Sequence, residues 1–297
     1  MRTIRFILLF ALVWPIALSA TEYSEEIAAW RAQRLQRLMA EEGFLSLAGL
    51  YWLREGDNSF GAAEDNDLVF PAGAPAHIGV FTLSDGVVSL QIERGVPVMH
   101  IDSTGAERAV QTLDFSDLKN DDPAALRLGS LRFYPIERDG RFGVRLKDVE
   151  SETRRHFAGI EHFAVDSLWR VEARFEIFAT PRSIEVPSII GTVSATPWPG
   201  DIVFTIAGQE QRLAVFGEIG DKLFFTVFAD ATNGQESYGG GRFLVVEHLG
   251  DGRVIADFNK AYTPPCAFTP YATCPLPPPQ NRLDVRIEAG ERYRGEH

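Results

Sequence analysis

Apolar residues follow a helical period only near the start of the chain, after the first twenty residues. Between Ser24 and Gly43 they recur three or four positions apart, a serine stands where the first turn needs a cap, and a glycine follows the end. The apolar set of this segment is Ile27, Trp30, Leu35, Leu38 and Met39. The spacing predicts one amphipathic helix over residues 24–43.

The rest of the chain shows the alternation that is typical of strands. Asp85-Gly86 and Asp139-Gly140 each separate two apolar runs, which predicts hairpins over residues 80–92 and 131–146. Further alternating stretches cover residues 171–177, 202–206, 213–216 and 223–228. Because no strand–helix–strand unit is visible, the pattern predicts a mainly β protein built from sandwiches or closed sheets.

The polar run DVESETRR, residues 148–155, separates two β-rich stretches, although it can equally be a long loop within one sheet. We predict an N-terminal helix and sandwich over 21–147 and a C-terminal β-rich domain over 148–297. A proline- and cysteine-rich loop, residues 257–283, closes the second unit. Seven prolines lie between Pro264 and Pro279, so this stretch cannot be a central strand and is expected to be an ordered surface loop.

The first twenty residues are typical of a secretory signal peptide. Arg2 and Arg5 precede an apolar run, and small residues before Thr21 offer a cleavage site. The alternative is an uncleaved membrane anchor, but the run is shorter than the roughly 20 residues of a spanning helix, and Pro15 interrupts it. We expect cleavage, a periplasmic or extracellular location and no stable membrane span in the mature chain.

Composition narrows the class of protein and its partners. The chain has 297 residues, of which 45% are hydrophobic, and it contains 2 cysteines, which excludes collagen-like, disordered and disulfide-scaffold classes. Its formal net charge is −12. Because this charge repels phosphate backbones, nucleic acid is not expected as a partner.

Four short motifs resemble a forkhead-associated-type sandwich: GDNSFG (56–61), DNDLVFP (65–71), PAHIG (75–79) and LGSLRF (128–133). The resemblance implies a two-sheet sandwich over about residues 56–140. Domains of that type bind phosphothreonine through an arginine after the first strand and a Ser-Arg-x-His turn. Here Ala62 follows the glycine and Pro75-Ala76 precedes His77. A phosphopeptide adaptor is therefore disfavoured, and an ordinary antiparallel sandwich is the alternative.

Two C-terminal segments resemble a bacterial domain-of-unknown-function family, DUF1684. They are SYGGGRFL (237–244) and DFNKAYTPPCAFTPYATCPLPPPQNRL (257–283). A third segment, GFLSLAGLYWLREGDNSFG (43–61), near the start of the mature chain, resembles the same family. The resemblance spans nearly the whole mature chain. It implies no established activity, so any chemistry has to come from the residues.

Cys266 and Cys274 lie in the proline-rich loop with seven residues between them. In an exported protein this proximity predicts a disulfide, worth about 2.5 kcal/mol in the chain-entropy account. The alternatives are a redox-active pair, half of a metal site and two free, packed thiols. The spacing matches neither the CxxC of oxidoreductases nor a standard zinc motif.

No motif predicts a cofactor or a metal. The six histidines form no HExxH or HxH spacing, and the chain has no GxSxG elbow, P-loop or dinucleotide fingerprint. We therefore expect no cofactor and no metal ion, and whether the protein is an enzyme stays open.

The run Gly239-Gly240-Gly241 before Arg242 can place backbone amides and a guanidinium around an anion. Neighbouring polar residues suit the same role, which gives a candidate ligand site of Tyr238, Arg242, Asp257, Asn259, Tyr262, Asn281 and Arg282. The leading hypothesis is a binding or structural envelope protein with a small polar or anionic ligand. The alternatives are a hydrolase, with Asp257 or Glu247 as base and Arg242 as clamp, and a loop lock in which Arg242 pairs with Asp257.

Overall fold

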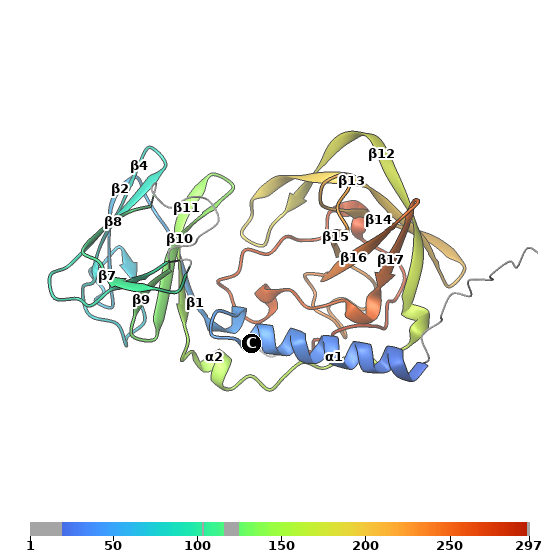
Figure 1. Cartoon of the computed structure of the whole chain (residues 1–297), viewed down its shortest axis with the longest axis horizontal. Coiled ribbons are helices and arrows are strands. Elements are labelled where there is room, and N and C mark those ends of the chain that lie inside the picture. Colours follow the sequence, from blue (N-terminus) through green and yellow to red (C-terminus); the bar gives the residue numbers. More distant parts are fainter. Residues whose placement is uncertain (1–19, 103, 116–124, 296–297) are drawn as a thin grey trace, which may run out of the picture.

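The structure is a computed structural model that describes residues 20–102, 104–115 and 125–295 (Figure 1). The predicted signal peptide, apart from Ala20, lies outside these residues. Two β-rich halves stand side by side, and one long helix, α1 (Ala20–Met39), runs along the C-terminal half. The prediction of a mainly β protein with one N-terminal helix is confirmed. Within the described ranges, no helix combines the length and the apolar character needed to cross a membrane.

The N-terminal half is a sandwich of two sheets. One has the order β1-β11-β10-β9-β6-β7 and the other the order β3-β2-β4-β5-β8. Their bounds are β1 Leu47–Trp52, β2 Gly56–Gly61, β3 Leu68–Val69, β4 Gly79–Ser84, β5 Val87–Ile92, β6 Met99–Ile101, β7 Glu107–Ala109, β8 Thr112–Asp114, β9 Ala125–Leu128, β10 Leu131–Arg138 and β11 Arg141–Asp148. A short 3-10 helix, η1 (Phe44–Ser46), leads into β1.

Both predicted hairpins are present in this half as β4–β5 and β10–β11. Their Asp-Gly turns take positive φ at both residues, 49° and 79° at Asp85-Gly86, which is the backbone that two-residue hairpin loops need. Alternate side chains of the two sheets fill one core. Phe60, Phe81 and Phe133 lie at its centre, with the rings of Phe60 and Phe81 4.6 Å apart. Burial of each such ring contributes about 1.5–3 kcal/mol to folding.

The connection between the halves contains the helix α2 (Glu152–Arg155) and the 3-10 helix η3 (Ser167–Trp169). Six strands follow in the sheet order β14-β13-β12-β17-β16-β15. Their bounds are β12 Arg170–Pro187, β13 Val193–Ile206, β14 Gln209–Val215, β15 Leu223–Phe228, β16 Arg242–Gly250 and β17 Arg253–Asp257. A backbone bridge between Phe216 and Phe225 joins the two edge strands, with N···O distances of 2.7 and 3.0 Å. The sheet therefore closes on itself.

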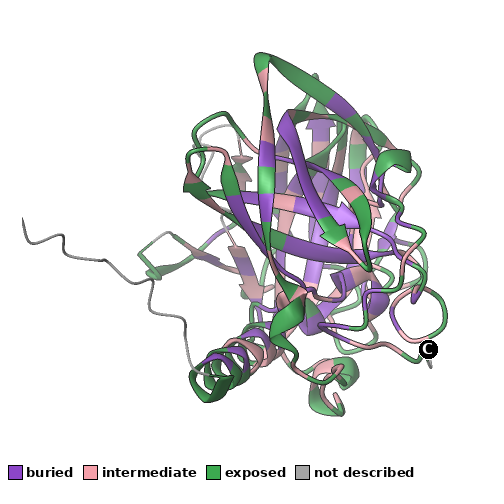
Figure 2. Ribbon diagram, turned by 90° about the vertical axis from the view of Figure 1, so that its right-hand side faces the viewer, coloured by how far each residue is buried: buried purple, intermediate pink, exposed green. Residues whose placement is uncertain are grey.

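Side chains from all six strands point into the closed sheet and form its core. The purple strands of Figure 2 show how completely this interior is buried, whereas α1 is buried along one face only. Residues of β16 alternate accordingly: Leu244 and Val246 point inward, whereas Val245 and Glu247 are exposed on the outer face. This alternation decides which side chains meet at the candidate site.

The proline-rich segment is ordered, as predicted, but it is not a surface loop. It contains the 3-10 helices η4 (Phe258–Lys260), η5 (Pro265–Ala267) and η6 (Pro279–Asn281). Ala272 and Cys274 pack with Leu47 of β1 and with Ile184 of the β12–β13 hairpin in a third core. The segment can be buried because proline has no amide N–H, so its many prolines leave few backbone donors that need a partner.

Candidate functional site

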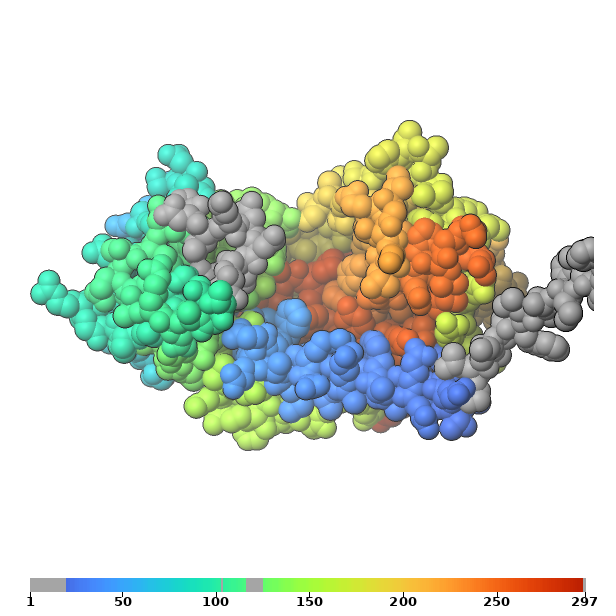
Figure 3. Space-filling view, in the orientation of Figure 1, coloured from blue at the N-terminus to red at the C-terminus, as the bar shows by residue number. Residues whose placement is uncertain are grey.

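A cleft of about 630 Å³ lies between α1 and the outer face of β15, β16 and β17. Its floor is apolar and consists of Leu223, Phe225, Phe243, Val245 and Ile255. Figure 3 shows α1 in blue crossing below the orange strands, with a recess above the helix. Leu223 is 60% exposed and Val245 44%, so nothing within the described residues covers this part of the floor. Uncovered apolar side chains in a concave surface are typical of binding sites.

The wall opposite the floor is formed by α1 and the segment after β17. Trp30 and Tyr262 lie with ring centroids 6.4 Å apart, and the edge of Phe243 meets Tyr262 at 5.6 Å. The guanidinium of Arg34 stacks on Tyr262, 4.8 Å from the ring centre. Four basic and four acidic side chains complete the lining: Arg34, Arg37, Arg170, Lys260, Glu26, Glu42, Glu247 and Asp257. The lining as a whole is therefore balanced in charge.

Buried polar contacts fix α1 in this position. Arg34 donates from Nε to Glu291 at 3.2 Å and from Nη2 to the carbonyl of Thr263 at 2.9 Å. The second oxygen of Glu291 accepts from the amide of Thr263 at 2.7 Å. Glu291 is fully buried, and burial raises the pKa of its carboxyl. Because these groups are buried, breaking their hydrogen bonds would leave them without a partner, since water does not reach them. The contacts therefore hold α1 in place as a wall of the cleft.

At one end of the cleft, Asp257 is held by three hydrogen bonds to a single oxygen. Oδ1 accepts from the Tyr23 hydroxyl at 2.8 Å, from the Asn259 amide N–H at 3.1 Å and from Asn259 Nδ2 at 3.4 Å. Burial, followed by the contact with Asp257, raises the pKa of Tyr23. Lys260 reaches the other oxygen of Asp257 only at 3.6 Å and donates to Glu26 at 2.5 Å. This polar cluster joins the first turns of α1 to the end of β17.

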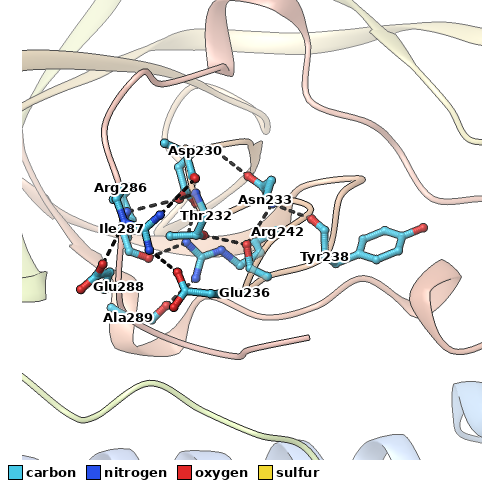
Figure 4. Close-up of polar contacts among 12 residues, drawn as sticks. Asp230, Thr232, Asn233, Glu236, Tyr238, Arg242, Arg286, Ile287, Glu288 and Ala289 are labelled. Atoms are coloured by element: carbon cyan, nitrogen blue, oxygen red, sulfur yellow. Dashed lines mark hydrogen bonds and ion pairs between the residues drawn. The ribbon is translucent and has the colours of Figure 1, made fainter. Parts of the chain in front are cut away.

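Arg242 does not line the cleft. Its side chain is completely buried inside the closed sheet, where Nη2 pairs with Asp230 at 2.5 Å and donates to the carbonyl of Ile287 at 2.8 Å (Figure 4). Nη1 donates to the carbonyl of Ala289. Burial lowers the pKa of the guanidinium, and the attraction of Asp230 opposes this shift. Arg242 thus locks the C-terminal segment to the sheet, and its ionic partner is Asp230 rather than the Asp257 suggested by the sequence.

Strand alternation separates the two residues of the hydrolase hypothesis. Arg242 precedes the inward-facing Leu244 of β16, whereas Asp257 of β17 lies among the outward-facing residues that line the cleft. Because successive side chains of a strand point to opposite faces, the proposed base and the proposed clamp lie on opposite sides of one sheet. They cannot act on the same atom of a substrate.

The other predicted residues are distributed over several places. Asp257 and Tyr262 line the cleft, and Asn259 supports Asp257 from behind. Asn281 is buried, where Oδ1 accepts from the Ala214 amide at 2.8 Å and Nδ2 donates to the Val227 carbonyl at 2.9 Å, so it joins β14 to β15. Arg282 is exposed and Tyr238 lies beside Tyr293, away from the cleft lining. Three of the seven predicted residues are therefore brought together.

The two cysteines are free thiols in the structure, so the expected disulfide is not formed in it. The Sγ of Cys274 instead accepts from the backbone N–H of Cys266 at 3.2 Å. A thiol–thiol hydrogen bond with Cys274 lowers the pKa of Cys266. The alternative of two packed thiols describes what is observed, because the loop packs as part of the third core without a cross-link. Elsewhere in the described part of the chain, no group of His, Cys, Asp and Glu is arranged to hold a metal ion.

Sequence reasoning missed the residues that α1 contributes, namely Tyr23, Trp30 and Arg34. Tyr23 and Arg34 lie four or seven positions from Ile27, on the face that is buried. This periodicity is visible in the sequence and marks the face that packs. It does not say that the face packs on the distant C-terminal half.

The family described as "Protein of unknown function (DUF1684)" has a model that matches residues 155–292. The match supports the resemblance seen in the C-terminal segments, whereas the forkhead-associated resemblance of the N-terminal half lies outside it and stays a prediction. An uncharacterized protein of Haloarcula marismortui with a solved structure is similar to this chain at 34% identity, covering 48% of this chain and 81% of that one, with a TM-score of 0.41. No curated protein matches the chain.

Proposed function

We propose that this protein binds a small amphiphile, a molecule with an apolar body and one polar group, in the cleft between α1 and the outer face of β15–β17. The observation that carries the proposal is the uncovered apolar floor at Leu223 and Val245 within a cleft of about 630 Å³. This volume is in the range of small-molecule sites. Burial of the floor under a ligand removes apolar surface from water, at about 25 cal/mol per Å².

The charges of the lining argue against a purely ionic ligand. Equal numbers of basic and acidic side chains surround the floor, and the pairs Lys260–Glu26 and Arg34–Glu291 already neutralise part of the wall. The expectation of an anionic ligand depended on Arg242, and that guanidinium is buried with Asp230, where a ligand in the cleft cannot contact it. A ligand held mostly by apolar contact fits this surface better than a small anion does.

The proposed place of action is outside the cytoplasm. Support comes from Arg2, Arg5, the apolar run behind them and the small residues before Thr21. Mass spectrometry of the protein recovered from the producing cell should find a new N-terminus close to Thr21. An intact Met1 in a cytosolic fraction would contradict export and leave the binding proposal untouched.

We also propose that the N-terminal half is a forkhead-associated-like sandwich that does not bind phosphothreonine. Its two facing sheets with one shared core support the fold assignment. The absence of the phosphate-binding arginine and of the Ser-Arg-x-His turn, at Ala62 and Pro75-Ala76, argues against phosphopeptide binding. Failure of a phosphothreonine peptide to shift the melting temperature is the expected result.

The binding proposal is tested with medium-chain amphiphiles that share one alkyl chain and differ in their polar group, used below their critical micelle concentrations. Calorimetry should detect binding to the wild type. Val245→Arg places a charged side chain on the floor and should abolish binding. Val193→Arg, at a 58% exposed position of β13 away from the cleft lining, is the matched control and should bind as the wild type does. Equal binding by both variants would refute the site.

A further inference from the structure

The carboxylate of Asp257 is held rigidly by one of its two oxygens. Oδ1 receives the three hydrogen bonds from Tyr23 and Asn259, and the whole residue is only 4% exposed. Tyr23 is itself held, because Asn259 Nδ2 donates to its hydroxyl at 2.9 Å. The position of the second oxygen, Oδ2, is therefore set by the fold and not by a bound molecule.

Oδ2 of Asp257 has no hydrogen-bond partner, although it is buried and the residue lines the cleft. A buried acceptor without a donor is destabilising, and more so when it carries charge. The nearest cation, Lys260, stands at 3.6 Å, which is an ion-pair distance but too long for a hydrogen bond. An acceptor that is fixed in position and lacks a donor is suited to a donor supplied by a ligand.

The neighbours of Oδ2 decide what kind of donor fits. Arg170 lies directly opposite Asp257 in the β12–β17 pair, and the Lys260 ammonium lies 3.6 Å from Oδ2. The Lys260 ammonium already holds the ion-pair position 3.6 Å from Oδ2 and would repel a second ammonium there, and the carboxylate itself disfavours an anion. An uncharged hydroxyl can donate to Oδ2 and at the same time accept from the Lys260 ammonium. The Lys260 side chain has a flexible stem and contacts Glu26, so a small shift of its ammonium can admit the hydroxyl and keep the ammonium within hydrogen-bond distance of the hydroxyl oxygen.

We infer that the ligand of the cleft carries an uncharged hydroxyl group, which donates a hydrogen bond to Asp257 Oδ2 while its apolar body lies on Phe225 and Val245. This inference rests on the proposed function. It assigns Asp257 as the residue that sets specificity and Lys260 as its partner on the same hydroxyl. The ligand class is thus an alcohol or phenol with an apolar body, not a fatty acid, an alkyl amine or a small anion.

The test compares a medium-chain alcohol with its methyl ether, which keeps the oxygen but lacks the donated hydrogen. The wild type should bind the alcohol at least about tenfold more tightly, since a hydrogen bond to a charged group contributes about 1.5–3 kcal/mol. Asp257→Asn keeps the shape of the side chain but replaces one acceptor with a donor. In that variant the alcohol-to-ether ratio should fall to about one with no loss of ether affinity, because the three donors at Oδ1 keep the amide oxygen there and the new N–H can donate to the oxygen of either probe.

A merely structural role for Asp257 would weaken alcohol and ether alike, so the ratio separates the two explanations. Asp251→Asn, in the exposed turn between β16 and β17, is the matched control and should keep the wild-type ratio. If Asp257→Asn does not fold, Lys260→Met offers a second measurement and should reduce the ratio several-fold. Equal binding of alcohol and ether by the wild type overturns the inference and leaves the proposed function standing. Binding of neither probe overturns both.

Discussion

Arg242 is the residue for which sequence and structure suggest the most different roles, and Arg242→Lys distinguishes them. In the structure its guanidinium makes hydrogen bonds to three acceptors, the Asp230 carboxylate and the carbonyls of Ile287 and Ala289, with no exposure to water. A lysine keeps the charge but presents one compact ammonium on a different stem. It can satisfy Asp230 and leaves the two carbonyls without a partner.

The expected loss of stability follows from these contacts. Hydrogen bonds from a charged donor contribute about 1.5–3 kcal/mol each, and the two abandoned carbonyls stay buried. Arg242→Lys should therefore lower the free energy of unfolding by about 3–5 kcal/mol, a large part of the 5–15 kcal/mol that is typical of folded proteins. Asp230→Ala should cost at least as much, because it leaves an unpaired cation in the core.

Urea unfolding followed by circular dichroism measures this loss as a lower transition midpoint. Arg286→Lys is the matched control. Arg286 is exposed and pairs with Glu236 and Glu288 on the surface nearby (Figure 4), so its replacement should change stability by less than about 0.5 kcal/mol. Folded Arg242→Lys protein should bind the alcohol probe as the wild type does. If that variant unfolded like the wild type and lost the probe, Arg242 would be a ligand clamp, and the reasoning would be refuted.

Two further predictions concern stability. Burial, reinforced by Arg31, lowers the pKa of His162 from 6.5 to about 4, so the stability gained from its neutral form is present above pH 6.5 and is lost as the pH falls toward 4. The urea midpoint of His162→Gln should therefore decline less steeply than that of the wild type between pH 6.5 and pH 4. Parallel declines of the two midpoints would contradict the lowered pKa of His162. Gly241→Ala should destabilise the protein strongly, because φ at this position is +93° and the new Cβ would lie 2.5 Å from Pro277. Gly234→Ala is the control: its φ is +77°, but open space surrounds it, so it should show only the smaller cost of backbone strain. Equal melting temperatures of the two variants would contradict the claim that the contact with Pro277 adds to the cost of Gly241→Ala.

Local features of the fold were predictable because their causes are local. The strand β15 occupies residues 223–228, as the alternation predicts, and the Asp-Gly turns place both hairpins within two residues of their observed ends. The helix was predicted over 24–43 and is observed over Ala20–Met39. Ser24 is not its cap but lies inside it, where the hydroxyl donates to the Ala20 carbonyl, and Gly43 belongs to the turn that follows the helix. Closure of the C-terminal sheet depends on the bridge between Phe216 and Phe225, and nothing in either strand alone specifies that contact.

The candidate site was predicted only in part for the same reason. Proximity in sequence grouped Arg242 with Asp257, but alternation along β16 and β17 places them on opposite faces of the sheet. The register shift between His248 and Gly250 changes which residues of β16 and β17 face each other, so a count of positions through the turn does not reveal this separation. The contribution of α1 was out of reach, since Tyr23 meets Asp257 across more than two hundred residues of chain. Amphipathic periodicity marks a packing face and leaves its partner unspecified.

The measurement that tests the account most directly is a crystal structure of the wild-type protein grown with a medium-chain alcohol. We expect the alkyl chain to lie along Phe225 and Val245 between α1 and the sheet, with the hydroxyl oxygen within hydrogen-bond distance of Asp257 Oδ2. An empty cleft, with the alcohol bound at another place on the molecule, would contradict the central claim.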